Sequence, residues 1–367
     1  MNESPVPLAD LTTMRVGGPA RELVRPGSAA ELVAAVAAAD AAGERWLVLG
    51  VGSNVVAPDA GLDATVVLTA GLRGIESVAA DDGRVHLRVA AGERWDDVVA
   101  FAVARGLAGI EALSGIPGSA GAAPVQNIGA YGQELAGALH AVELHDPTTG
   151  GTAWVPAAGL GLGYRTSALK RGRTGVVLAI ELALAPAGDG TIGYEQLAAA
   201  LGVPVGGAAP LARIREAVLA LRREKGMLDP AVSPEGSLPS CGSFFLNPIV
   251  DENWARSLPA GAPRWPVGQD EADLAAPLDE GPRHRVYPDR RDVKLSAAWL
   301  IEHAGIGRGW SLPGSRAAIS PRHTLAIVNT GGALAREVVQ LAEFVQLRVS
   351  QEFGINLRPE PVILTAD

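Results

Sequence analysis

The sequence predicts a mixed α+β protein, because helical and strand patterns follow one another along the whole chain. Residues 28–69 read as a helix followed by two short apolar strands, which is typical of an α/β unit. Residues 85–89 alternate apolar and polar side chains, and residues 175–184 (GVVLAIELAL) are almost wholly apolar, so both are expected to be strands. Near the C-terminus, residues 333–353 carry apolar side chains at helical spacing.

The first helix, expected over 28–42, begins with Ser28-x-x-Glu31, a capping box, and Gly43 is its expected C-cap. Strands are expected at 46–49 and 65–69. In the strand at 85–89, Val85, Leu87 and Val89 are expected to be buried, and His86 and Arg88 to be exposed.

The later elements follow the same reasoning. A helix over 95–105 should end at Gly106, and Val142 and Leu144 mark another strand. Residues 211–225 read as an amphipathic helix, whereas the Pro-rich stretch 255–290 is hard to assign. In the last helix, Leu334, Val338, Leu341, Val345 and Val349 form the expected buried face, and Gly354 ends it.

Composition narrows the class of protein. A chain of 367 residues with 48% hydrophobic and 19% charged residues suits two or three globular domains. A net charge of −9 argues against a general nucleic-acid binder, so any phosphate site must be built locally. One cysteine excludes a disulfide framework and fits a cytoplasmic protein. The start MNESPVPLAD lacks a signal-peptide pattern, and no apolar run suits membrane insertion.

The central stretch is 114–132, SGIPGSAGAAPVQNIGAYG, in which seven of nineteen residues are Gly or Pro. Such a segment cannot be the interior of a helix or strand, and glycines let a ligand approach the backbone. Gln126, Asn127 and Tyr131 are its only long hydrogen-bonding side chains. From the residues alone, a structural glycine-rich loop and a binding loop are both open.

A second glycine loop lies upstream, where an apolar strand runs into Gly50-x-Gly52-Ser53-Asn54. Val55 stands where a Rossmann turn has its third glycine, and a break at 58–61 replaces the expected helix. The loop still offers successive backbone N–H groups and a hydroxyl, which suit a pyrophosphate.

Taken together, the two loops resemble the FAD-binding half of the UDP-N-acetylenolpyruvoylglucosamine reductase family. Further motifs of that family follow in order along nearly the whole chain: MRVGGPA at 14–20, YRTS at 164–167, GSFF at 242–245 and RPE at 358–360.

The resemblance implies a fold and a cofactor. It predicts an FAD-binding, PCMH-type (vanillyl-alcohol-oxidase-like) α/β module over 1–200, with subdomains of about 1–70 and 71–200. A smaller α/β substrate-binding domain should occupy 201–367, with the tail 355–367 returning to the active site. FAD is expected to be noncovalent, because no flavin-tethering residue is evident. The implied cofactor-binding residues are Gly50, Gly52, Ser53, Asn54, Gly115, Ile116, Pro117, Gly118, Ser119, Gln126, Asn127, Gly129, Ala130 and Tyr131.

Three residues carry the implied catalysis. Arg165 would be a cation beside the flavin, Ser243 the proton donor to the substrate carbon, and Glu360 a carboxyl facing the substrate double bond. Without the resemblance they would read as a surface arginine, a structural loop serine and a strand-edge carboxylate. Leu169 and Leu246 replace an aromatic residue and a lysine of the family pattern, which leaves the role of position 246 open.

The resemblance also implies residues that hold a UDP-sugar: Tyr194, Lys225, Asn247 and His323. Tyr194 implies the subtype in which a tyrosine loop covers the substrate. The six histidines show no metal-ligand spacing, so no metal is expected, and Cys241 is expected to be a bystander. The expected partners are small molecules, with no nucleic acid and no membrane; a monomer is one open oligomeric state.

The implied reaction is the NADPH-dependent, FAD-mediated reduction of UDP-N-acetylglucosamine enolpyruvate to UDP-N-acetylmuramate. Two alternatives stay open. One is another flavoenzyme on the same scaffold, such as an oxidase, against which the GSFF and RPE motifs argue. The other is a non-catalytic nucleotide-sugar binder, against which the joint presence of Arg165, Ser243 and Glu360 argues.

Overall fold

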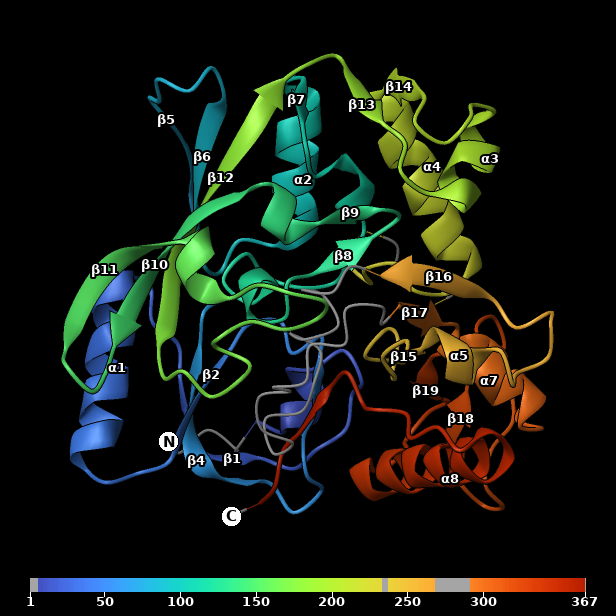
Figure 1. The fold of residues 1–367 in the computed structure, drawn as a ribbon. Helices are drawn as coiled ribbons and strands as arrows, with labels where there is room; N and C mark the ends of the chain where they lie inside the picture. The colour runs from blue at the N-terminus through green and yellow to red at the C-terminus, as the bar shows by residue number, and fades with distance from the viewer. Residues whose placement is uncertain (1–5, 233–236, 268–290, 367) are drawn as a thin grey trace. The chain divides into compact units, whose positions relative to one another are not determined.

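The computed structural model describes residues 6–232, 237–267 and 291–366 (Figure 1). The chain forms two compact units. The large unit comprises Ala20–Gly52 and Asp63–Ser237, and the C-terminal unit comprises Met1–Pro19, Ser53–Leu62 and Leu238–Asp367. This division differs from a boundary at residue 200, because residues 201–237 belong to the large unit and two N-terminal segments belong to the C-terminal unit.

The large unit begins with a three-stranded sheet in the order β1–β4–β2 (Ala20–Val24, Leu62–Leu68, Trp46–Leu49), in which β2 and β4 are parallel. Helix α1 (Ala29–Ala41) starts as the sequence predicts, with the Ser28 hydroxyl accepting a hydrogen bond from the Glu31 N–H. The Glu31 carboxylate accepts from Gly27 N rather than from Ser28 N, so only half of the predicted capping box forms. Leu32 and Val36 of α1 are buried against Val67 of β4.

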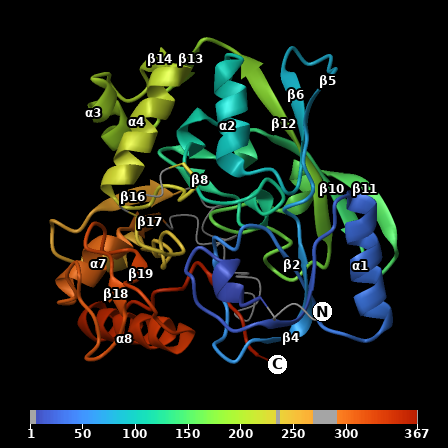
Figure 2. The same cartoon turned by 180° about the vertical axis from the view of Figure 1, so that it is seen from behind.

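A larger, antiparallel sheet runs in the order β11–β10–β12–β6–β5, and Figures 1 and 2 show these strands side by side. Its strands are β5 (Ile75–Val78), β6 (Val85–Ala90), β10 (Leu139–Asp146), β11 (Gly151–Pro156) and β12 (Val176–Pro186); the short β7 (Leu107–Ala108) pairs with β12. Helix α2 (Trp95–Ala104) buries Trp95, Val98 and Val99 in the same core as the strand residues Leu87 and Leu182.

Strand β6 corrects one expectation. Val89 is buried as predicted, but His86 is also buried, although the alternating pattern places it on an exposed face. The reason is polar pairing: its two ring nitrogens lie 2.9 Å from Glu181 Oε1 and 3.0 Å from Asp82 Oδ2. A buried polar side chain is tolerated when its hydrogen bonds are satisfied.

The large unit closes with a small helical part. Strands β13 (Asp189–Thr191) and β14 (Ala208–Pro210) pair, and helices α3 (Glu195–Leu201) and α4 (Leu211–Glu224) contribute to one core through Leu197, Ile214 and Val218. Shorter elements of this unit are β8 (Gly129–Ala130), β9 (Gln133–Glu134) and the 3-10 helices Glu111–Leu113, Ala123–Val125, Leu135–Gly137 and Ala157–Leu160.

The described residues of the C-terminal unit form three small sheets: β15–β17–β16 (Ile249–Asp251, Asp292–Leu295, Arg264–Val267), β18–β19 (Ala317–Ile319, Ile327–Asn329) and β20–β3 (Val362–Ile363, Val55–Val56). The helices in the described part of this unit are the 3-10 turn Leu8–Asp10, α5 (Glu252–Ala255), α7 (Ala297–His303) and α8 (Ala335–Phe353). Within the unassigned stretch 255–290, β16 is defined, and 268–290 lies outside the described residues.

Helix α8 carries the predicted buried face and ends at Gly354, which has a φ of +66°. Val338, Leu341, Val345 and Val349 are buried, but Leu334 is 37% exposed, because the helix begins one residue after it. The Asp59 carboxylate accepts hydrogen bonds from Ala335 N (2.6 Å) and Arg336 N (3.1 Å), so the segment 53–62 caps this helix.

Candidate active site

The two glycine loops meet in the large unit. A Cβ added at Gly50 would clash with the Ser119 Oγ, so the absence of a side chain at Gly50 gives this hydroxyl its present position. Ser119 is 2% exposed, and its hydroxyl has no hydrogen-bond partner among the described residues. A buried hydroxyl without a partner is unfavourable, and a phosphate or ribose oxygen would satisfy it. The two loops therefore fit a dinucleotide cofactor.

Gly115 is held by charged residues that the sequence did not single out. Its N–H donates to Asp96 Oδ1 (2.6 Å), and its carbonyl accepts from Arg222 Nε (3.0 Å). Arg215 in turn makes two hydrogen bonds, 2.6 and 2.7 Å long, to the Asp96 carboxylate. The Gly115 N–H is already bonded to Asp96, so it is not available to a cofactor. Gly115 therefore shapes the loop. Asp96 and Arg222 lie in helices expected only to pack, so the sequence offered no signal for this role.

The rest of the predicted binding loop is also ordered by its own contacts. Asn127 is fully buried, and its side chain bonds to Glu134, Gly163 and Ala136, which makes it a structural anchor. Trp95 N donates to the Gly118 carbonyl, and Ala130 pairs with Gln133. The remaining predicted residues are half-buried or buried: Gly52, Ser53, Ile116, Pro117 and Gln126.

Arg165 lies against this loop. Its guanidinium donates to the carbonyls of Gly129 (2.5 Å) and Asn127 (3.4 Å), and lies 3.6 Å from a Glu134 oxygen. A Cβ added at Gly129 would lie 2.8 Å from Arg165 Nη1, so glycine makes room for the guanidinium.

Backbone strain gathers at the same place. Asn127, Tyr131 and Arg165 have φ values of +46°, +48° and +53°, in the left-handed region that non-glycine residues rarely adopt. Strain of this kind persists only where surrounding contacts enforce it, and it is common at functional sites. It therefore supports a functional role for this loop.

Two predicted substrate residues also come together in the large unit. The Tyr194 ring meets the Tyr131 ring edge-on, with centroids 5.8 Å apart, and Lys225 Nζ lies 5.2 Å from the Tyr131 centroid. Lys225 Nζ donates to Gln196 Oε1 at 2.6 Å. Burial, together with the charge of Arg222, lowers the pKa of Lys225. Tyr194 is 40% exposed, which leaves its ring available to cover a ligand.

In the C-terminal unit, the GSFF and RPE motifs lie side by side. Phe245 pairs with Pro359 in an antiparallel bridge, and Glu360 N donates to the Phe244 carbonyl at 2.9 Å. This pairing brings Ser243 and Glu360, 117 residues apart in the chain (360 − 243), to neighbouring backbone segments. Asn54 Nδ2 donates to the Glu360 carbonyl at 3.2 Å, so the end of the first glycine loop joins this group.

The other predicted residues of this unit have different surroundings. Asn247 Oδ1 accepts a hydrogen bond from Ala297 N (3.0 Å) at the start of α7, and His323 is half-buried in the turn before β19. Cys241 is buried, and burial raises the pKa of its thiol to about 12. A thiol at neutral pH is a poor nucleophile, which supports the view of Cys241 as a bystander.

Two histidines and a glutamate form a group that the sequence did not predict. His86 and His140, which look scattered along the chain, lie with Glu181 close enough to hold a metal ion. Only the sheet reveals this, because the three residues come from three different strands.

Comparisons with known proteins identify the family of each part of the chain. Residues 20–151 match the family model for an FAD binding domain, and residues 233–364 match that for the UDP-N-acetylenolpyruvoylglucosamine reductase C-terminal domain. The UDP-N-acetylenolpyruvoylglucosamine reductase of Leifsonia xyli is 54% identical over 98% of both chains, and that of Nocardia farcinica is 47% identical over 97% of this chain and 88% of its own.

A solved structure is similar over the same extent. The crystal structure of the Thermus caldophilus reductase (MurB) has a TM-score of 0.61 and 25% identity, covering 99% of this chain and 98% of its own. No described helix is long and apolar enough to cross a membrane. Sequence identity over nearly the full length, an FAD-binding domain and the matching C-terminal domain show that this chain belongs to the UDP-N-acetylenolpyruvoylglucosamine reductase family of oxidoreductases.

Proposed function

We propose that the protein reduces UDP-N-acetylglucosamine enolpyruvate to UDP-N-acetylmuramate, with NADPH as the electron donor and noncovalent FAD as the carrier. The observation that supports this proposal is the pairing of the GSFF and RPE motifs, in which Phe245 bridges Pro359 and Glu360 N donates to the Phe244 carbonyl. An FAD-binding protein with another activity would not need a hydroxyl residue and a carboxyl residue on these two paired segments.

The residues that would hold FAD are those of the two glycine loops, with the free hydroxyl of Ser119 as a direct donor. Bound FAD supplies the hydride that adds to the methylene carbon of the enolpyruvyl group. The protein's part is to orient the two reactants and to exclude water, which converts an encounter into a positioned reaction.

Addition of a hydride to the methylene carbon leaves an electron pair on the neighbouring carbon, delocalised into the carboxylate. We assign Arg165 and Glu360 to this charge: a guanidinium stabilises it electrostatically, and a protonated carboxyl donates a hydrogen bond. Ser243 then gives its hydroxyl proton to the neighbouring carbon, and water restores that proton. The substrate gains two hydrogens in all, which balances the oxidation of one NADPH and the uptake of one proton.

Four residues are assigned to substrate binding. Lys225 carries a positive charge that suits a diphosphate, and Tyr194 presents an exposed ring that can cover the bound sugar, as in the tyrosine-loop subtype. Asn247 and His323 remain the proposed contacts from the C-terminal unit. The buried thiol of the single cysteine is compatible with action in the reducing cytoplasm.

The test is a product assay. Purified protein is incubated with NADPH and either the enolpyruvyl sugar or UDP-N-acetylglucosamine, which lacks the double bond. We expect NADPH consumption only with the enolpyruvyl sugar, and a product heavier by two hydrogens in mass spectrometry. NADPH consumption that is independent of the sugar, with oxygen as the acceptor, would instead identify an oxidase.

A further inference from the structure

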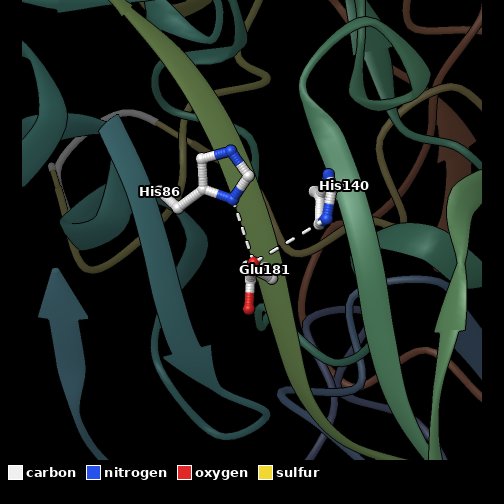
Figure 3. A group of neighbouring side chains, drawn as sticks. All are labelled: His86, His140 and Glu181. Carbon is white, nitrogen blue, oxygen red and sulfur yellow. Dashed lines mark hydrogen bonds and ion pairs between the residues drawn. The ribbon is translucent and has the colours of Figure 1, made fainter. Parts of the chain in front are cut away.

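Two histidines and a glutamate converge on one face of the large unit's sheet (Figure 3). His86 lies on β6 and His140 on β10, and Glu181 lies on β12, which runs between those two strands. The cross-strand pair Leu87–Leu182 faces the core around α2, so His86 and Glu181, at alternate positions, lie on the opposite face. None of the three residues belongs to a glycine loop or to the proposed active site.

His140 lies on this face because it follows Leu139, which faces the core around α2, and the strand register breaks at this position. Leu139 pairs with Leu182, but the next pair is Ala141 with Glu181, so His140 is an extra residue in β10. Such a bulge redirects a side chain, and bulges are frequent next to functional sites. Leu139 is buried in the core around α2, and His140 Nε2 lies 3.9 Å from Glu181 Oε1.

The ligand atoms of the three residues are already close. They all lie within 4.8 Å of one another; His86 Nδ1 is 2.9 Å and His140 Nε2 is 3.9 Å from Glu181 Oε1. The ligand atoms of a tetrahedral zinc ion are roughly 3.3 Å apart, at metal distances of about 2.0–2.2 Å. Since the His140 side chain is 53% exposed, a small rotation suffices to bring its nitrogen into range.

The surroundings provide the outer contacts that metal-binding histidines need. His86 Nε2, the nitrogen that does not face Glu181, lies 3.0 Å from Asp82 Oδ2. A carboxylate on the second ring nitrogen fixes the orientation of a histidine ligand and strengthens it. The second oxygen of Glu181 accepts from Arg88 Nη2 at 3.1 Å, which holds the carboxylate and leaves Oε1 for the ion.

We propose that His86, His140 and Glu181 bind a divalent transition-metal ion, with zinc the best match. Asp82 then orients the His86 ring through its contact with Nε2. Imidazole and carboxylate ligands suit zinc, and three protein ligands leave one position for water. On binding, the ion takes the place of hydrogen on His86 Nδ1. The ion would join β6, β10 and β12, so its role is structural and independent of the reductase reaction.

The experiment is a competition between untagged holoenzyme and a chromophoric chelator for Zn²⁺. Wild-type protein should take up one equivalent more than the His140→Ala variant, which removes only a half-exposed ring. Asp82→Asn should still bind this ion, but about 10–100-fold more weakly, as expected for an outer contact. His303→Ala is the matched control, because that ring stacks on Trp299 in the C-terminal unit, and it should bind zinc as the wild type does.

A second readout separates binding from folding. Zinc should raise the melting temperature of the wild type and of His303→Ala but not that of His140→Ala, while reductase turnover stays equal in all three. Equal zinc uptake by wild type and His140→Ala would overturn the proposal, as would an Asp82→Asn variant with unchanged affinity.

Discussion

At the scale of single residues, Ser243 separates the two halves of the proposed reaction. Reduction of the flavin by NADPH requires no proton at the sugar, so Ser243→Ala should leave that half nearly intact. Reoxidation by the enolpyruvyl sugar requires a proton at the carbon beside the carboxylate, and a positioned acid contributes roughly 10²–10⁴-fold. Stopped-flow absorbance of the flavin measures each half separately.

Two variants sharpen this test. Ser243→Cys should recover part of the reoxidation rate, because a thiol also donates a proton. Ser257→Ala removes an exposed hydroxyl from the same unit and should change neither half. If Ser243→Ala slowed both halves equally, the hydroxyl would be a structural group of the loop.

Arg165→Lys should reduce turnover more than substrate affinity. Lysine keeps the charge but loses the planar fork, which in this structure also holds the carbonyls of Asn127 and Gly129. Loss of one preorganised donor costs roughly 3 kcal/mol, about a hundredfold in rate. Arg171→Lys, in the same segment, is the control. A raised Michaelis constant with normal turnover would reduce Arg165 to an anchor for the substrate.

Cys241 gives a pH prediction. Burial raises the pKa of its thiol to about 12 in the folded protein, above the value of about 8.5 for an exposed thiol. Its contribution to folding stability is therefore complete below about pH 8.5 and declines as pH rises toward 12. An alkylating reagent at mildly alkaline pH should label Cys241 only in denaturant. Rapid labelling of the native protein would show that the thiol is accessible and ionised.

At the scale of elements, the capping of α8 by Asp59 connects the segment 53–62 to the C-terminal unit. Asp59→Ala should lower the free energy of unfolding by about 1–2 kcal/mol, because two N–H groups at the helix start lose their acceptor. Asp59→Asn, which keeps one oxygen acceptor, should lose less. Urea midpoints measure both, and equal midpoints for wild type and Asp59→Ala would show that water replaces the cap.

Elements with strong local patterns were predictable from the sequence. The strand at 46–49 and the helix 95–105, for example, agree with β2 and with α2 to within one residue. The buried state of His86 was not predictable, because it depends on Glu181 in a strand far along the chain. The bulge at His140 was equally hidden, since register is a property of two strands and not of one.

The site was predictable only in part, for the same reason. Its residue types were visible as motifs, and the structure shows Arg165 against the Gln126–Tyr131 loop and the GSFF segment paired with the RPE segment. The network that holds Gly115 was not visible, because Asp96 and Arg222 act through tertiary contacts between helices and loop.

At the scale of the whole molecule, the chain order conceals the division into units. Residues 53–62 lie inside the N-terminal half of the sequence yet belong to the C-terminal unit, where β3 pairs with β20 near the chain's end. A single boundary residue cannot describe this division, because the segment 53–62 of one unit lies between two segments of the other in the sequence. The proposed roles are divided likewise: Arg165, Tyr194 and Lys225 lie in the large unit, and Ser243 and Glu360 in the C-terminal unit.

A spectral titration without oxygen tests whether the enolpyruvyl sugar is the acceptor of the flavin's electrons. The purified protein should be yellow, acid should release all of its flavin as FAD, and NADPH should bleach the bound flavin. UDP-N-acetylglucosamine enolpyruvate should then restore the oxidised spectrum, with one equivalent of sugar consumed per flavin. Flavin that stays reduced with this sugar, and regains its colour only when oxygen is admitted, would contradict the account.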